Sequence, residues 1–249
     1  MANIMITGAT GTIGVEVSRY LINKHSLTLV AQDFSTFPKE LADRSTLVTA
    51  DLTEPDNWEG VLDDIEYIIQ FAGQADQNAE FYSSLLDLNY KIPHNLYQAA
   101  MHAPKLKRVI VASSIHAVDA YPENTQVKVT DPIRPKNLYG VSKVYIEALA
   151  AHHAYVNGIE SIAIRIADYK ASDDELEPDA DKNGMAMYLS KRDMNHLIDC
   201  CLKAELQEPF LLVNGISNNT FPRLSLDEAR VKLNYQPQDN AFEKNHIFE

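Results

Sequence analysis

Gly8-Ala9-Thr10-Gly11-Thr12-Ile13-Gly14 decides the fold, because this stretch joins a short apolar run at residues 4–6 to a helical pattern at residues 12–24. In this GxxGxxG spacing, Gly8 permits a tight turn, Gly11 lets a pyrophosphate approach the backbone, and Gly14 lets the helix pack close to a sheet. The helix N-terminus presents free N–H groups and a partial positive charge to phosphates. The stretch therefore predicts a dinucleotide-binding turn in which Thr12 and Ile13 also contact the cofactor. A tight strand–helix turn without a ligand is the alternative.

Short apolar runs alternate with amphipathic segments through the rest of the chain. We expect strands at residues 27–30, 46–48, 67–71, 109–112 and 161–166, helices at 78–101 and 138–156, and a further helix opened by Pro55. Such alternation is typical of a parallel sheet with helices on both faces, connected by right-handed crossovers. The predicted fold class is therefore α/β, with a doubly wound parallel sheet of the Rossmann type.

The last third of the sequence is less regular. Residues 168–184 are acidic and polar and predict a loop over a site. A helix at 190–204, a strand at 210–213 and a helix from the capping-box pattern Ser225-Leu226-Asp227-Glu228 to residue 233 should follow. We find no internal repeat and no flexible linker. The chain is therefore expected to form a single domain over residues 1–249, in which residues 168–249 contribute a small C-terminal lobe.

Composition excludes several classes of function. With 249 residues, 45% of them hydrophobic and 23% charged, the chain is long enough for one large domain with a substantial core. A formal net charge of −13 argues against nucleic-acid binding through phosphate contacts. No apolar run approaches the ~20 residues that span a bilayer, and the first residues lack a signal-peptide pattern. We therefore expect a cytoplasmic protein that binds neither nucleic acid nor membranes.

Four further features have simple structural interpretations. The two cysteines, Cys200 and Cys201, are adjacent and are not expected to pair. No cluster of His, Cys and Asp has metal-ligand spacing, so no metal is predicted. His152-His153 is expected to be exposed to solvent, and Arg192-Asp193 is expected to form a surface ion pair.

Asp33 ends the second predicted strand, where a carboxylate can accept both hydroxyls of an adenosine ribose. The same carboxylate would repel a 2′-phosphate, and no Arg is adjacent to it. This favours NAD over NADP, although a simple turn residue before Phe34-Ser35 remains the alternative. Other residues at strand ends are expected to contact the cofactor: Asp51 and Leu52 beside the adenine, and Ala72 and Gly73 where the cofactor passes close to the backbone.

Tyr139-Gly140-Val141-Ser142-Lys143 gives a YxxxK pattern near the start of a predicted helix, and a spacing of four puts both side chains on one face. A free tyrosine, with a pKa of ~10, is a poor base at neutral pH. A nearby ammonium and the positive nicotinamide ring would favour the phenolate, and a downward shift of ~3 units corresponds to ~4 kcal/mol. Tyr20 and Lys24 share this spacing but lie at the far end of the first helix, so they are expected to be surface residues.

Ser113-Ser114 ends the strand before Tyr139, and ligands of open α/β sheets bind at that edge. The Ser114 hydroxyl could hydrogen-bond a substrate oxygen there, or it could simply be a polar strand end. Together, Ser114, Tyr139 and Lys143 predict a catalytic triad.

In this order, the glycine turn, Asp33, Ala72-Gly73, Ser113-Ser114 and the YxxxK segment resemble the extended short-chain dehydrogenase/reductase superfamily, which includes sugar epimerases and dehydratases. The likeness spans nearly the whole chain and is greatest to the short uronate dehydrogenases. It is strongest at residues 111–116, 138–143, 164–166 and 235–242.

The resemblance implies NAD-dependent oxidation of a sugar C1 hydroxyl to a lactone, with Tyr139 as the base. Ser114 would hold the oxygen, and Lys143 would bind the nicotinamide ribose and tune Tyr139. It further implies that Asn89 holds a proton-relaying water and that Ile166 contacts the cofactor. Helices around residues 80–100 and 139–157 would pair subunits into a dimer or higher homo-oligomer.

Several substrate positions depart from the family pattern. The positions that would contact substrate are Ala75, Ser114, Ile115, His116 and Asp168. Uronate dehydrogenases carry Asn in place of Ile115 and serines in place of Ala75 and Asp168, whereas His116 is retained. Their carboxylate-binding Arg has no counterpart in residues 168–189, and a uronate carboxylate would require such a bidentate partner. We therefore hypothesise a neutral sugar or polyol as substrate.

Two other classes of function remain open. An epimerase or dehydratase that retains its NAD would usually have a larger C-terminal domain for a nucleotide-sugar. A non-catalytic NAD-binding regulator would not need the intact set of Ser114, Tyr139 and Lys143.

Overall fold

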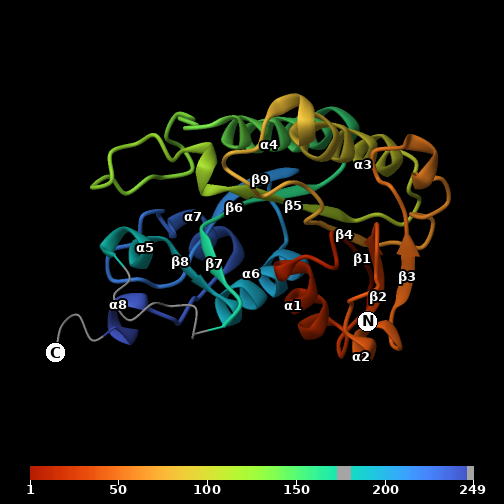
Figure 1. Ribbon diagram of the computed structural model, residues 1–249, viewed down its shortest axis with the longest axis horizontal. Coiled ribbons are helices and arrows are strands. Elements are labelled where there is room, and N and C mark those ends of the chain that lie inside the picture. Colours follow the sequence, from red (N-terminus) through yellow and green to blue (C-terminus); the bar gives the residue numbers. More distant parts are fainter. Residues whose placement is uncertain (173–180, 246–249) are drawn as a thin grey trace.

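The computed structural model describes residues 1–172 and 181–245, and its centre is a seven-stranded sheet (Figure 1). The strand order is β3-β2-β1-β4-β5-β6-β9, and every neighbouring pair is parallel. The strands are β1 (Asn3–Thr7), β2 (Ser26–Ala31), β3 (Thr46–Thr49), β4 (Tyr67–Gln70), β5 (Arg108–Ser114), β6 (Ser161–Ile166) and β9 (Phe210–Gly215). The order reverses between β1 and β4, so the predicted doubly wound fold is confirmed.

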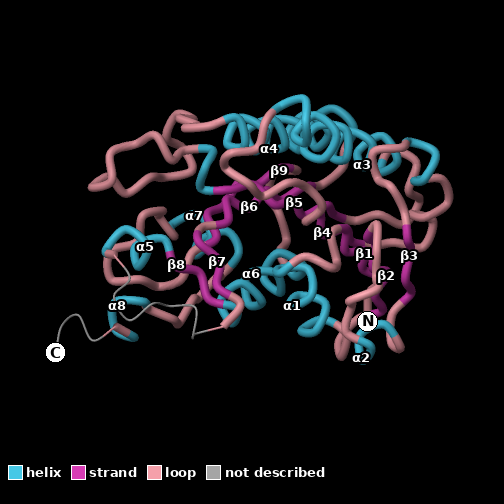
Figure 2. The backbone as a smooth tube through the Cα atoms, in the orientation of Figure 1, coloured by secondary structure: helices cyan, strands magenta, loops and turns pink. Residues whose placement is uncertain are grey.

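Helices cover both faces of this sheet (Figures 1 and 2). One face carries α1 (Thr12–Leu21) and α6 (Lys191–Lys203), and the other carries the π-helical segment η2 (Phe81–Lys91), α3 (Ile92–Ala100) and α4 (Leu138–Asn157). The shorter elements are α2 (Lys39–Ala42), η1 (Pro55–Trp58), η3 (Ile115–Ala117), β7 (Asp168–Lys170), α5 (Lys182–Met187), β8 (Tyr188–Ser190), α7 (Asp227–Leu233) and α8 (Ala241–Lys244). Within the described ranges, no helix is both long enough and apolar enough to cross a membrane.

Two apolar layers hold the helices on the sheet. Ile4 and Ile6 of β1 pack into the layer with α1 and α6, whereas Met5 between them packs into the layer with α3 and α4. Because both faces are covered, the strand is a continuous apolar run rather than an alternating one. Each such side chain stabilises the fold by about 1.5–3 kcal/mol when it is fully buried.

Helix α4, which carries the YxxxK pattern, is fixed at both ends. The side chain of Asn137 accepts a hydrogen bond from the Gly140 N–H at 2.7 Å, which caps the first turn. Gly158 ends the helix with φ of 71°, a left-handed conformation that glycine adopts without strain. The position of Tyr139 in the first turn is therefore set locally by the cap.

Several predicted elements differ in detail from the observed ones. Pro55 opens a single 3₁₀ turn rather than a longer helix. The helix expected at 78–101 begins at Phe81 and is π-helical up to Lys91, just before Pro93, which has no N–H to offer the preceding turn. In the expected capping box, Ser225 Oγ accepts from the N–H of Asp227 instead of Glu228, so α7 begins at Asp227.

The predicted loop at 168–184 begins with a strand. β7 pairs in parallel with β8, and the two form a small second sheet beside the main one (Figure 1). Residues 173–180 of that predicted loop lie outside the described residues. The sequence around β7 does not predict this strand, because its partner β8 lies about 20 residues further along the chain.

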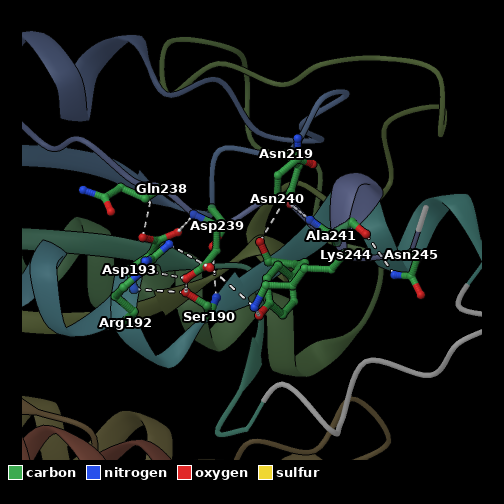
Figure 3. Close-up of polar contacts among 12 residues, drawn as sticks. Ser190, Arg192, Asp193, Asn219, Gln238, Asp239, Asn240, Ala241, Lys244 and Asn245 are labelled. Carbon is green, nitrogen blue, oxygen red and sulfur yellow. Dashed lines mark hydrogen bonds and ion pairs between the residues drawn. The ribbon is translucent and has the colours of Figure 1, made fainter. Parts of the chain in front are cut away.

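The expected surface pair Arg192-Asp193 is wrong. Asp193 is 1% exposed, and its carboxylate accepts hydrogen bonds from the backbone N–H groups of Gln238 and Asp239 at 2.9 and 3.0 Å (Figure 3). Arg192 pairs instead with Asp239 at 2.8 Å. The carboxylate of Asp239 also accepts from Ser190 Oγ at 2.6 Å, so this cluster ties the C-terminal segment to the start of α6 and the end of β8.

Only half of the expectation for the histidine pair is correct. His152 is exposed, but His153 is 3% exposed and stacks on Tyr97 of α3, with ring centroids 4.8 Å apart. Adjacent residues face different sides of a helix, and the face of α4 that carries His153 packs against α3.

Candidate active site

The glycine turn has the shape that the sequence predicted. Gly8 has φ of +68°, and a Cβ built on it would lie 2.6 Å from the Ala72 backbone nitrogen. A Cβ on Gly14 would overlap the Gly8 carbonyl oxygen. Gly11 caps α1 without any side-chain hydrogen bond, which leaves the first N–H groups of the helix for a ligand. The turn therefore suits an anionic group such as a pyrophosphate.

A cavity of about 530 Å³ opens beside this turn, at the carboxyl edge of the sheet. It brings together most of the residues that the sequence singled out. Those lining it are Gly8, Gly11, Thr12, Ile13, Gly14, Gly73, Ala75, Ser114, Tyr139, Lys143 and Ile166. The proposed catalytic residues and the proposed phosphate turn thus share one cavity.

A second hollow of about 430 Å³ adjoins the first, since both include Gly8 and Gly73. Asp33, Leu52 and Ala72 line it, as the sequence predicted. The two hollows together form a groove that crosses the sheet where the strand order reverses between β1 and β4. This is the place where open α/β sheets bind dinucleotides.

The carboxylate of Asp33 at the outer end of this groove is exposed and ionised. Its oxygens accept hydrogen bonds from the hydroxyl and the N–H of Ser35 at 2.6 and 2.8 Å. These bonds, the hydroxyl's first, hold the pKa of Asp33 below its ordinary value. Among the described residues that line the second hollow there is no Arg or Lys. A 2′-phosphate placed here would therefore meet a negative charge without a cation to balance it.

Tyr139, Ser114 and Lys143 meet at the inner end of the groove. The Ser114 hydroxyl lies near enough to the Tyr139 hydroxyl to lower its pKa, and the Lys143 Nζ lies 5.4 Å from the centre of the Tyr139 ring. Lys143 Nζ donates to the Ala112 carbonyl at 2.9 Å, which fixes the position of the ammonium in the cavity lining. Helical spacing accounts for this geometry, because Tyr139 and Lys143 are one turn apart on α4.

Burial acts on both groups in opposite directions. It raises the pKa of the Tyr139 hydroxyl, against the opposing effect of the Ser114 hydrogen bond. It lowers the pKa of Lys143 to about 8. The lysine therefore does not offset the burial of the tyrosine by itself. The phenolate therefore needs a further positive charge in the cavity, and an oxidised nicotinamide ring would supply one.

Asn89 is buried behind the site and does not line the cavity. Its amide donates to the Gln74 carbonyl at 3.0 Å and to Ser142 Oγ at 2.8 Å, and its Oδ1 accepts from the Gln74 N–H at 2.7 Å. Both amide hydrogens are thus in use. These bonds fasten the segment at Gly73 and Gln74 to α4, and the water-holding role that the resemblance implies for Asn89 stays a prediction.

Four other predicted residues lie outside the linings of both hollows. Ile115 is 6% exposed and packs in the apolar core. Asp51 accepts from the N–H and hydroxyl of Thr53. Asp168 pairs with Lys170 at 3.3 Å, while its neighbours Ala167 and Tyr169 line the cavity. Successive side chains of a strand face opposite ways, which turns Asp168 away.

His116, the fourth of these, stands next to the site without lining the cavity. Its ring packs edge-on against the Tyr139 ring, with centroids 5.4 Å apart. Its Nδ1 is 3.5 Å from the Asp119 carboxylate, and burial lowers its pKa. His116 therefore supports the Tyr139 ring from outside the cavity.

Sequence reasoning missed part of the lining. The additional residues of the inner cavity are Phe71, Gln74, Ala112, Ser113, Ala167 and Tyr169. Phe71 and Ala167 directly follow β4 and β6, so their strand-end positions could have indicated them. Gln74 and Tyr169 belong to no motif, and no local signal marks them.

Comparison with known proteins places the chain in a family. The NAD dependent epimerase/dehydratase family matches residues 4–183. The chain belongs to this family. Among its relatives is an NAD-dependent glucose-6-phosphate dehydrogenase of Haloferax volcanii, 29% identical over 96% of this chain and 94% of its own. An L-arabinose 1-dehydrogenase (NAD(P)(+)) of the same organism is 29% identical over 97% of this chain and 98% of its own.

The fold agrees with a solved structure from the same family of enzymes. A mutant uronate dehydrogenase from Agrobacterium tumefaciens, crystallised in complex with NAD, superposes with a TM-score of 0.84. The two sequences are 25% identical, and the match covers 99% of this chain and 89% of the other. The similarity to uronate dehydrogenases inferred from the motifs is thus confirmed.

Proposed function

We propose that the protein is an NAD-dependent dehydrogenase that oxidises a hydroxyl of a sugar or polyol, at C1 when the substrate is an aldose. One observation carries this: Ser114, Tyr139 and Lys143 line the same cavity as the glycine turn, and the groove continues to Asp33. The relatives named above, which are dehydrogenases of sugars or a sugar phosphate, support it.

Three residues of the cavity have a defined part in this reaction. Ser114 Oγ, which lies near the Tyr139 hydroxyl, would hold the substrate oxygen at hydrogen-bonding distance from Tyr139. Tyr139 Oη would accept the hydroxyl proton as the C–H bond breaks and the carbonyl forms. Lys143 would bind the nicotinamide ribose and add positive charge beneath the phenolate. Bound NAD would accept the hydride.

The outer hollow favours NAD over NADP. The ionised Asp33 can accept both ribose hydroxyls, and the described lining offers no cation to a 2′-phosphate. Leu52 and Ala72 provide the apolar surface beside it. Asp51 lies outside the lining and its Oδ1 accepts from Thr53, so its contact with the adenine is the least supported part of this assignment.

The inner cavity favours a neutral substrate. Among its described lining residues, Lys143 is the only charged one, and none is Arg. A uronate carboxylate would have no bidentate partner there. Tyr169 is the residue through which the C-terminal lobe, residues 168–249, reaches the lining. We therefore propose that this lobe completes the substrate side of the single NAD-binding domain, as the sequence suggested.

A substrate screen tests the proposal. D-glucose, L-arabinose, D-galacturonate and glucose 6-phosphate would each be incubated with NAD, and NADH would be followed by its absorbance. We expect NADH from a neutral aldose. A strong preference for galacturonate would reject the neutral substrate. If none of the four, nor a polyol panel, yields NADH while a nucleotide-sugar is epimerised, the dehydrogenase proposal fails in favour of an epimerase.

We also propose that the protein forms a homodimer or larger homo-oligomer through the helices around residues 80–100 and 139–157. These helices expose large apolar side chains, namely Tyr82, Leu138, Val141, Tyr155 and Val156. Light scattering after gel filtration would measure the mass, and a monomer at micromolar concentration would contradict the proposal. A cytoplasmic location is part of the same proposal.

A further inference from the structure

A buried polar cluster lies directly beneath the proposed active site. Arg165 of β6 binds the carboxylate of Glu147 on α4 through two bonds, from Nε and Nη2, each 2.8 Å long. Ser113 of β5 donates its hydroxyl to the same carboxylate at 2.5 Å. None of the three residues is more than 7% exposed. The cluster thus joins α4 to two neighbouring strands.

Each member of this cluster either lines the cavity, as Ser113 does, or adjoins a residue that lines it. Glu147 follows Tyr139 and Lys143 at intervals of four, so all three lie along one face of α4. Ser113 directly precedes Ser114 in β5, and Arg165 directly precedes Ile166 in β6. A rotation or shift of α4 over the sheet would therefore move the tyrosine and lysine relative to the serine.

The pair is also electrically balanced. The positive charge of the Arg165 guanidinium balances the negative charge of the Glu147 carboxylate. The two groups together therefore add no net charge near Lys143. In a buried environment an unbalanced charge acts over a distance: at an effective dielectric constant of ~20 and ~12 Å along a helix, it changes a pKa by about one unit.

We propose that Glu147 and Arg165 are positioning residues. Their ion pair, together with the Ser113 hydroxyl, fixes α4 on the sheet and leaves no net charge beneath Tyr139 and Lys143. This rests on the proposed function, because it takes Tyr139 as the base. Ionisation of Tyr139 is then governed by the groups that face it and by the cofactor. Those groups are Lys143 of α4, Ser114 of β5, His116 of η3 with its partner Asp119, and Tyr169 of β7 in the same cavity.

The first experiment unbalances the charge. Glu147→Gln leaves Arg165 cationic, so the ascending limb of kcat/KM against pH should shift about one unit to lower pH. The double variant Glu147→Met/Arg165→Met removes both charges and should return the limb to within about 0.3 unit of wild type. Asp199→Asn, which removes a carboxylate on α6 away from both hollows, is the matched control and should leave the limb unmoved. Equal shifts in the single and double variants, or no shift in Glu147→Gln, would overturn the charge balance.

The second experiment keeps the charge and disturbs the geometry. Arg165→Lys retains the positive charge but loses the two-bond contact. We expect kcat to fall about tenfold with the pH limb in place, and circular dichroism to show a native fold. An unchanged kcat would overturn the positioning role, even if Glu147→Gln does not fold. The Kd for NAD, measured by calorimetry, should stay within about twofold because neither residue lines the groove.

The assay uses the sugar that gives most NADH in the screen above, and Tyr139→Phe is measured beside these variants. Full activity in Tyr139→Phe would defeat the proposed function itself. Loss of activity in Tyr139→Phe, together with unmoved limbs and kcat in the cluster variants, would defeat only the present inference.

Discussion

The chain contains two YxxxK pairs, Tyr20–Lys24 on α1 and Tyr139–Lys143 on α4, and they differ in everything except spacing. In the first pair the Lys24 Nζ lies 3.6 Å from the tyrosine ring centre, nearer than the 5.4 Å of the second pair. Yet only Tyr139 lies in a cavity with a glycine turn.

The partners of each pair explain the difference. Tyr20 and Lys24 both bind the carboxylate of Asp199, at 2.7 and 2.9 Å. Burial raises the pKa of Tyr20, and Asp199 raises it further against the effect of Lys24. Burial lowers the pKa of Lys24, but its bonds to Tyr20 and Asp199 outweigh this and leave the value raised. The ammonium is thus balanced by a carboxylate, and its effect on Tyr20 is outweighed by burial and Asp199, so the pKa of Tyr20 stays raised.

Lys143, in contrast, donates to a backbone carbonyl, and no carboxylate of the described residues forms an ion pair with it. The comparison teaches that closeness of an ammonium does not make a tyrosine basic. What matters is whether the positive charge is already balanced, and whether a cavity can admit more of it.

The largest effect should come from the two tyrosines. Tyr139→Phe removes the group that accepts the proton and should lower kcat/KM by about 10³-fold, within the range for general bases. Tyr20→Phe removes only a bond to Asp199 and should leave kcat/KM within about twofold. Equal losses in steady-state assays of the two variants would abolish the distinction between the pairs.

The two lysines should differ in their effect on stability. Folding lowers the pKa of Lys143 from 10.5 to about 8, which corresponds to a cost of up to about 3 kcal/mol for keeping it charged at neutral pH. Lys143→Met should therefore raise the free energy of unfolding in urea by about 1–3 kcal/mol while it lowers kcat/KM. Lys24→Met, which breaks a half-exposed ion pair, should lower it by less than about 1 kcal/mol. A destabilised Lys143→Met protein would contradict this account.

The same lysine predicts a pH dependence. Between pH 8 and 10.5 the unfolded chain keeps the proton of Lys143 that the folded chain has released, so the Lys143 contribution to stability should rise with pH across this window. The kcat/KM of the free enzyme should fall as Lys143 loses its charge above a pH of about 8. Lys24→Met should leave that descending limb in place. A descending limb that moves with Lys24→Met would contradict the assignment.

The smallest effect concerns two carboxylates, Asp33 in the groove and Asp199 beside the Tyr20–Lys24 pair. Asp33→Ala should raise KM for NAD about tenfold and improve the use of NADP, since a charged hydrogen-bond acceptor is lost and a repulsion removed. Asp199→Ala should change neither the KM for NAD nor the use of NADP. If Asp33→Ala leaves the ratio of NAD to NADP use unchanged, Asp33 does not select the cofactor.

The groove could be predicted from sequence because its parts are local. The glycine turn, Asp33, Ser114 and the YxxxK pair each follow or begin an element, and parallel strands bring their carboxyl ends to one edge. The spacing within a motif therefore survived into the structure. Which of the two YxxxK pairs lines the cavity also followed from its place after Ser113-Ser114.

The rest depended on partners distant in sequence. Asp168 was placed in the site, but pairing with β8 forms β7 and turns that side chain toward Lys170. Asp193 was placed at the surface, but two backbone N–H groups near residue 238 enclose it. Gln74 and Tyr169 line the cavity without belonging to any motif. Single-sequence patterns report the face of an element and not the element that will cover it.

The buried Asp193 has a consequence for the order in which this enzyme can be made. Its carboxylate has these hydrogen bonds only once Gln238 and Asp239 are present to donate their N–H groups. Asp239 in turn accepts a hydrogen bond from Ser190 at the end of β8. Because β8 supports β7, and β7 carries Tyr169 into the cavity, a nascent chain that stops short of residue 239 lacks the support for one cavity wall. The motifs of the nucleotide groove precede Tyr169 in the chain, whereas the support of the cavity wall that Tyr169 forms is complete only when residue 239 has been made.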